Sequence, residues 1–111
     1  MIELIIRKYL VSKLEIPVVL EHQKNLPKRY ILLEKTSGKR NNYLNSSTIA
    51  IQSYAESLLE AAKLNEKIKN IMYDLVAVDE VSRVDLNSDY NFTDPETKQY
   101  RYQAVFDINY Y

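Results

Sequence analysis

The stretch "YRYQAVFDINYY", residues 100–111, alternates between apolar or aromatic side chains and mainly polar ones. Successive side chains of a β-strand point to opposite faces, so this alternation predicts a strand with one face on the protein core. The side chains expected on that face are Tyr100, Tyr102, Ala104, Phe106, Ile108 and Tyr110. The chain should therefore contain a sheet that other elements cover on one face.

Two helices are predicted to provide this cover. Residues 2–14 carry apolar side chains at the spacing of one helical face, namely Ile2, Ile5, Ile6, Tyr9 and Leu10. "SYAE", residues 53–56, matches a capping box, and an apolar arc follows it to about residue 76, so a second helix should begin at Ser53. A further flank of that helix, made of Ala55, Leu59, Ala62 and Tyr73, is apolar beyond what one contact with a sheet requires.

The remaining segments predict strands and turns. Strand composition is found at residues 17–22, 30–36, 43–52 and 81–93. "SGKRNN", residues 37–42, supplies turn residues, and Gly38 is placed where a hairpin would need positive φ. The sequence thus predicts one α+β domain over residues 1–111, in the order α-β-β-β-α-β-β. Two helices should pack on one face of a mainly antiparallel sheet, from which a long hairpin projects.

Composition excludes several classes of protein. The 15 basic and 15 acidic residues cancel, which argues against the strong positive field of a nucleic-acid-binding protein. The single glycine argues against a phosphate-binding loop, and the lack of cysteine excludes disulfides. No apolar run approaches the roughly 20 residues of a membrane span, so we expect a soluble intracellular product with no membrane partner.

The sequence predicts no catalytic residue, no metal site and no cofactor. His22 is the only histidine, and the sequence around it is typical of a solvated strand end. Asp85, Asp89 and Asp94 weakly resemble a calcium loop, but the glycine and final glutamate of that motif are missing. We therefore interpret these carboxylates as ordinary turn and strand-end residues.

Two features instead suggest an interaction surface. The hairpin tip carries three positive charges in the segment Lys35, Thr36, Ser37, Gly38, Lys39 and Arg40, and Asn41 and Asn42 follow. This segment is either a solvated hairpin end or a loop that contacts an acidic partner or DNA. Tyrosine hydroxyls need partners or water, and the chain has ten tyrosines, two phenylalanines and no tryptophan, which favours at least one exposed aromatic patch.

Two stretches of the chain resemble the small tail-completion, or tail-terminator, proteins of long-tailed bacteriophages. They are residues 30–68 and 84–110, and the most telling pieces are "EKTSG", "TIAIQSYAESLLEAA", "NSDYNFTD" and "RYQAVFDI". The N-terminal third resembles the family only in pattern. The family often has two glycines at the hairpin tip, where this chain has Ser37 and Gly38.

The resemblance implies a structural protein and not an enzyme. Subunits would form a ring, typically a hexamer, that caps the tail tube and joins it to the head connector. The implied partners are other copies of the chain, the major tail tube protein, the head connector protein and DNA passing through the lumen. The protein would belong to the neck of the virion, after assembly in the host cytoplasm.

The implied contact surfaces can be placed on this sequence. The hairpin segment 35–40 would contact the ring opening or a neighbouring subunit. Leu59, Tyr73, Tyr100, Tyr102 and Tyr110 would contact other subunits or the tube. Alternatives are another neck component, such as a head-completion or connector-adaptor protein, and a single-stranded nucleic-acid-binding module that stacks bases on sheet aromatics. A small enzyme using His22 is the remaining alternative.

Overall fold

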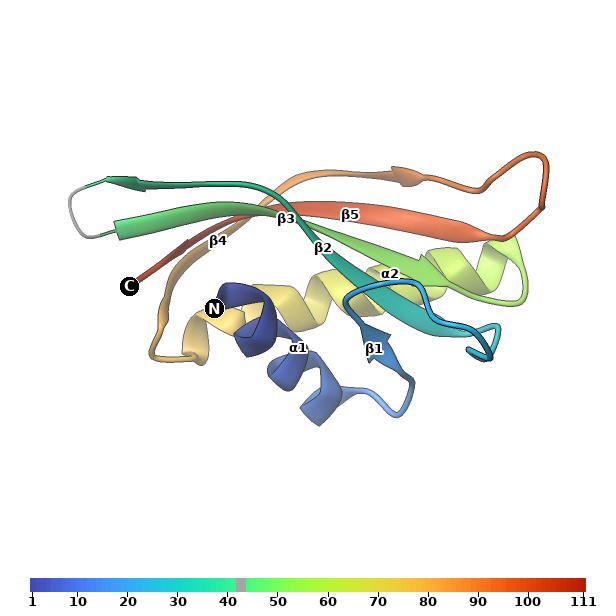
Figure 1. Ribbon diagram of the computed structural model, residues 1–111, viewed down its shortest axis with the longest axis horizontal. Coiled ribbons are helices and arrows are strands. Elements are labelled where there is room, and N and C mark those ends of the chain that lie inside the picture. The colour runs from blue at the N-terminus through green and yellow to red at the C-terminus, as the bar shows by residue number, and fades with distance from the viewer. Residues whose placement is uncertain (42–43) are drawn as a thin grey trace.

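The computed structural model describes residues 1–41 and 44–111, and its centre is a twisted sheet (Figure 1). Within these residues the sheet has five strands in the order β1-β2-β3-β5-β4. Their bounds are β1 Val18–Val19, β2 Tyr30–Asn41, β3 Leu44–Tyr54, β4 Val81–Asn91 and β5 Arg101–Tyr110. Neighbouring strands are antiparallel except β1 and β2, which are parallel. This confirms the predicted α+β class and the element order.

Both helices pack on the same face of the sheet, as predicted (Figure 1). They are α1 (Ile2–Lys13) and α2 (Leu58–Tyr73), and a 3-10 turn, η1 (Asp74–Ala77), extends α2. Ile6 of α1 and Ile68 of α2 are fully buried, and both belong to one apolar cluster with Phe106 of β5. The apolar faces that the helical spacing predicts for α1 and α2 therefore pack against the apolar face that the alternation predicts for β5.

The alternation along β5 correctly predicts which side chains enter this core. Ala104, Phe106 and Ile108 are completely buried, whereas Asp107 between them is exposed. Tyr110 is partly buried and packs against the same cluster. Most of the aromatic and apolar face of the strand therefore serves the fold.

The second helix begins four residues later than the sequence pattern predicts. The N-cap is Ser57, whose hydroxyl accepts a hydrogen bond from the backbone N–H of Glu60 at 3.2 Å. Ser53 instead lies in β3 opposite Ile31, and the adjacent Tyr54 is fully buried. Residues 53–60 hold two consecutive capping boxes, 53–56 and 57–60, and pairing of β3 with both neighbours keeps the start of the first one extended.

The predicted turn at Gly38 is also wrong. Residues 35–40 belong to β2, and the paired strands continue until Asn41 faces Leu44. Gly38 has no positive φ. A Cβ at Gly38 would approach Lys35 Cε to 2.8 Å, so this glycine makes room for a lysine side chain. Asn42, and the predicted strand start at residue 43, lie outside the described residues.

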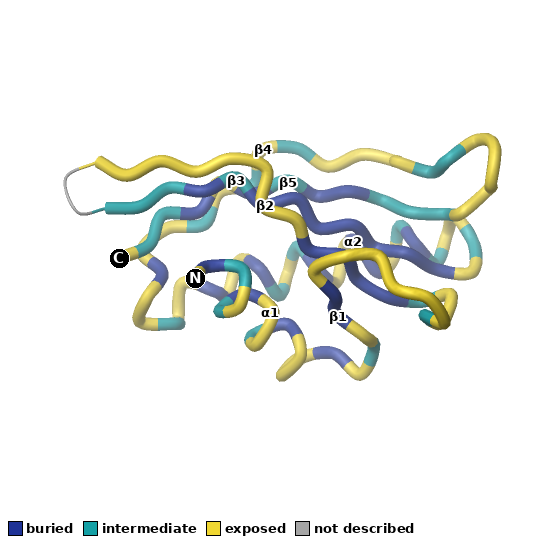
Figure 2. Tube along the Cα trace, in the orientation of Figure 1, coloured by how far each residue is buried: buried dark blue, intermediate teal, exposed yellow. Residues whose placement is uncertain are grey.

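The hairpin is longer than expected because β3 pairs with both β2 and β5 from Asn45 to Tyr54. Side chains join these strands beyond the helices: the Ser47 hydroxyl is 2.8 Å from the Tyr110 hydroxyl, and the Thr48 hydroxyl donates to Asp107 at 2.9 Å. Figure 2 shows β2 changing from buried to exposed as it extends past the helices. We call residues 34–41 of β2 and 44–48 of β3 the hairpin arm.

Candidate interaction surface

The face of the sheet opposite the helices, here called the outer face, carries a hydrogen-bonded network of glutamine, tyrosine and arginine. Gln52 and Gln103 lie directly opposite each other on β3 and β5, and Gln52 Nε2 donates to Gln103 Oε1 at 3.0 Å. The Tyr54 hydroxyl donates to Gln52 Oε1 at 2.7 Å and accepts from Arg101 Nη1 at 2.9 Å. Gln103 in turn donates to the Tyr90 hydroxyl. Gln52, Tyr54 and Gln103 are buried, so the bonds among them are costly to lose.

This network continues into aromatic side chains at two ends. Tyr54 stacks on Tyr30 with ring centroids 4.3 Å apart. Burial raises the pKa of Tyr30 to about 12. At the other end, Tyr90 meets the edge of Phe92, and the Arg101 guanidinium lies 4.6 Å from the centre of the Phe92 ring. Tyr90 and Phe92 are exposed, so the outer face offers two rings and a cation to a partner.

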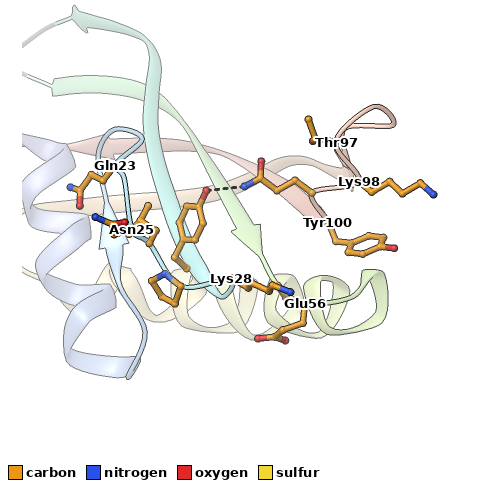
Figure 3. Close-up of a pocket in the computed structure, with 12 residues that line it drawn as sticks. Gln23, Asn25, Lys28, Glu56, Thr97, Lys98 and Tyr100 are labelled. Carbon is orange, nitrogen blue, oxygen red and sulfur yellow. Dashed lines mark hydrogen bonds between the residues drawn. The ribbon is translucent and has the colours of Figure 1, made fainter.

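A cavity of about 540 Å³ opens at one end of the sheet, between residues 23–28 and residues 97–100 (Figure 3). The two non-glycine residues with positive φ in the described chain, Asn25 (67°) and Lys98 (53°), both line it. Lys98 closes a single turn, in which its N–H bonds Asp94 O at 2.9 Å, so its conformation is that of a helix C-cap. Gln99 Nε2 lies 3.5 Å from the Tyr30 hydroxyl inside the cavity (Figure 3).

Beside this cavity, Arg29 forms ion pairs with two glutamates. Arg29 donates to Glu56 at 2.7 Å and to Glu60 at 3.1 Å. The hydrogen bond from Arg29 lowers the pKa of Glu56, and the bond to Glu56 raises the pKa of Arg29. These pairs tie the loop that contains Arg29 to the start of α2, which is a structural role.

The flank of α2 is exposed only in part and is not a continuous apolar patch. Leu59 is 64% exposed and Tyr73 is 46% exposed, whereas Ala62 is half-buried. Between Leu59 and Tyr73, Lys69 forms ion pairs with Glu66 at 2.7 Å and with Asp89 of β4 at 3.0 Å. Ala55, which the sequence placed on this flank, precedes the helix and is buried.

The tyrosines in and just before β5 that were predicted to contact partners, Tyr100, Tyr102 and Tyr110, are all half-buried. The Tyr110 hydroxyl bonds Ser47, and the carbonyl of Tyr100 accepts from the N–H of Ala55 at 3.2 Å. Tyr102 lies opposite Ser53 and Asn91. Of the three, Tyr110 packs against the core, and each of the three residues remains partly accessible.

The residues considered for chemistry are separated from one another. His22 is exposed, and its ring forms an edge-to-face contact with the Tyr54 ring, with the ring centroids 6.3 Å apart. Asp85 pairs with Arg83 at 2.6 Å, Asp89 pairs with Lys69, and Asp94 accepts from the N–H of Glu96 at 2.9 Å. In residues 1–41 and 44–111, no group of three or more histidine, cysteine, aspartate or glutamate side chains is placed to hold a metal ion.

Sequence reasoning missed the glutamine and tyrosine network of the outer face. The alternation along β5 places Gln103 away from the core, but its partner Gln52 is about 50 residues away and becomes visible only through the strand register. No helix in the described part of the chain has the length and apolar character needed to cross a membrane. Neither a protein-family model nor a curated protein matches the chain.

Proposed function

We propose that this protein is a bacteriophage tail-completion protein, whose copies form a ring that caps the tail tube and joins it to the head connector. The sequence resemblance over residues 30–68 and 84–110 supports this proposal. In this role the partners are other copies of the chain, the tail tube protein, the head connector protein and the DNA that passes through the lumen. The site of action is the virion neck, reached from the host cytoplasm, and no catalytic step is involved.

The observation that carries the proposal is the exposure of large apolar side chains along α2 and its 3-10 extension. Leu59, Tyr73 and Val76 are all exposed, although the core already uses the opposite side of the helix. Burial of apolar surface contributes about 25 cal/mol per Å², so a second protein surface on this flank would be favourable. A ring subunit needs such a surface in addition to its core.

The shape of the molecule is also suited to this role. Its longest dimension is 44 Å, against 25 Å for the other two, and the hairpin arm lies at one end of that long axis. The exposed part of β2 in the arm carries Lys35, Lys39 and Arg40. In a ring, this basic arm would meet a neighbouring subunit or the DNA in the lumen.

Complementation tests the proposal. A phage that lacks this gene should make tails of uncontrolled length or tails that do not join heads. Replacing Leu59 and Tyr73 by aspartate should reproduce the defect while the purified protein remains folded, because both side chains are exposed. The matched control is Val11→Asp on α1, a side chain that is 46% exposed, and it should leave tails normal. Normal-length, head-joined tails from the clean deletion would refute the assignment.

A related neck role, as a head-completion or connector-adaptor protein, predicts a different binding partner. Binding of the purified protein to tail tubes supports the tail-completion role. Binding to DNA-filled heads that lack tails supports the adaptor role. Electron microscopy of the protein mixed separately with tubes and with heads distinguishes the two.

A second candidate function is binding of single-stranded nucleic acid. The observation that favours it is the exposed pair Tyr90 and Phe92, with Arg101 over the Phe92 ring, on the outer face of the sheet. Fluorescence anisotropy with labelled oligonucleotides at low salt tests it, and Tyr90→Ala with Phe92→Ala should abolish any binding. The balanced charge of the chain makes the structural role the stronger proposal.

A further inference from the structure

Two strand edges of the sheet are open. Strand β1 pairs with β2 only at Ile31 and Leu32, so the described part of β2 after Leu32 has a neighbouring strand only on the β3 side. At the opposite edge, β4 pairs with β5 from Val81 to Asn91, and no further strand of the described chain adjoins it. Open edges present backbone N–H and C=O groups to any strand that can approach.

The two open edges carry opposite charge. Residues 34–41 of β2 contain three basic side chains and one acidic side chain, which are Lys35, Lys39, Arg40 and Glu34. Residues 79–91, which form β4 and lead into it, contain four acidic side chains and one basic side chain, which are Asp79, Glu80, Asp85, Asp89 and Arg83. Pairing of like edges would bring equal charges together, whereas pairing of unlike edges would bring opposite charges together.

The charges on the two edges also match in spacing and in face. Residues directly opposite each other on paired strands lie on the same face of the sheet. Lys39 is opposite Ser46, which is opposite Asn109, and this places Lys39 on the outer face. Asp85 is opposite Asp107, which places it on the outer face as well. On the helix side of the sheet, Lys35 lies opposite the buried Ile49, and Asp89 bonds Lys69 of α2.

Lys35 and Lys39 lie on opposite faces, although they are four residues apart, because a bulge between Lys35 and Ser37 shifts the alternation. A bulge between Leu86 and Ser88 does the same for Asp85 and Asp89. An antiparallel register that places Lys39 beside Asp85 therefore also places Lys35 beside Asp89, with each pair on one face. A carboxylate accepts more than one donor, so Asp89 has room for Lys35 in addition to Lys69.

The strand directions allow this pairing between copies in the same orientation. Strand β2 is antiparallel to β3, β3 to β5, and β5 to β4, so the two open edges run in opposite directions within one subunit. Copies related by the axis of a ring keep their strand directions relative to that axis. The β4 edge of one copy and the β2 edge of the next are then antiparallel, as the charge register requires.

We propose that the β4 edge of one subunit pairs with the β2 edge of a second copy, antiparallel, with Asp85 beside Lys39 and Asp89 beside Lys35. This contact is heterologous, so it leaves one open edge at each end of a dimer, and further copies add until the rotation between subunits closes the ring. The inference names the subunit contact of the proposed ring and rests on that proposed function. The bulges and the like charges disfavour pairing of a β2 edge with another β2 edge, or of a β4 edge with another β4 edge. The complementary charges favour pairing of a β2 edge with a β4 edge.

Engineered cysteines test the contact directly, because the chain contains no cysteine of its own. In the proposed register Ser37 faces Asn87, and both side chains are exposed. The double variant Ser37→Cys with Asn87→Cys, oxidised at millimolar protein concentration, should give a ladder of disulfide-linked dimers, trimers and higher species. Either single variant should remain monomeric, since a heterologous contact does not bring two copies of the same position together.

The register has its own control. Ser37→Cys with Arg83→Cys displaces the second thiol by four residues, about 13 Å along the strand, which is beyond the reach of a disulfide. This variant should give no ladder. A ladder from the displaced pair, strong dimers from either single variant, or no ladder from the matched pair would each overturn the proposal.

Charge reversal supplies an independent test in the matched cysteine background. Lys39→Glu and Asp85→Lys should each slow ladder formation about two- to fivefold, the effect expected of one exposed ion pair. An equimolar mixture of the two variants should recover the original rate, because each then pairs with the other. Lys24→Glu, the same charge change on an exposed loop residue, should have no effect.

The outcome is separable from that of the proposed function. A ladder from a protein whose deletion leaves phage tails normal supports the edge contact and refutes the phage role. Defective tails from the deletion, together with no ladder, support the phage role and refute the edge contact. Failure of the mixed variants to recover would also refute the register.

Discussion

Removing the hydroxyl of Tyr54 should destabilise the protein far more than removing the hydroxyl of Tyr30, although the two rings stack on each other. The Tyr54 hydroxyl donates to Gln52 at 2.7 Å and accepts from Arg101 at 2.9 Å, whereas the Tyr30 hydroxyl lies 3.5 Å from Gln99 Nε2. In Tyr54→Phe the buried Oε1 of Gln52 loses its donor, which costs about 1–3 kcal/mol. Tyr30→Phe should cost less than about 0.5 kcal/mol.

Urea unfolding followed by far-ultraviolet circular dichroism measures both effects. A loss of about 2 kcal/mol, with a urea slope of about 2 kcal/mol per M, lowers the unfolding midpoint of Tyr54→Phe by about 1 M. In a Gln52→Leu background no carboxamide remains to lose its donor, so Tyr54→Phe should cost clearly less. Equal losses for Tyr54→Phe and Tyr30→Phe, or an unchanged loss in the Gln52→Leu background, would refute the reasoning.

Three further predictions concern capping and pH. Ser57→Ala should cost about 1 kcal/mol in the same unfolding assay, because it removes the N-cap of α2. Ser53→Ala should be neutral or stabilising, because it removes a buried hydroxyl that has no hydrogen-bond partner among the described residues. Since burial raises the pKa of Tyr30 to about 12, the folded state holds this proton more tightly than the unfolded chain does, so stability falls as the pH rises from about 10 towards 12. Tyr30→Phe should flatten this fall in a pH series of unfolding midpoints, and an unchanged series contradicts the assignment. The pKa of Glu56 is lowered by Arg29, so its contribution to stability is present above the ordinary pKa of a glutamate and is lost as the pH falls through the lowered value. Arg29→Gln should reduce this loss of stability at acid pH. The same decrease of the unfolding midpoint at acid pH in the variant and the parent protein argues against the pair.

The local sequence determined which faces of the elements are buried. The alternation that ends in Tyr110 predicts the buried Ala104, Phe106 and Ile108, and the helical spacing predicts the buried Ile6 and Ile68. The exposure of Leu59 and Tyr73 also follows from helical spacing, since the core occupies the other side of α2. These features depend on periodicity within a few turns or a few strand residues, and a single sequence contains that information.

Only the tertiary structure decided where the elements end and which side chains meet across strands. Ser53 and Tyr54 of the first capping box remain in β3 because β2 and β5 pair with them on both sides. The hairpin passes Gly38 because β3 pairs with β2 as far as Leu44 and with β5 as far as Asn45. The Gln52–Gln103 bond and the match of Lys35 and Lys39 with Asp85 and Asp89 depend on register and on bulges. Register arises from contacts between residues far apart in the chain, so local periodicity, which assigns each side chain to a face, leaves its partner on that face undetermined.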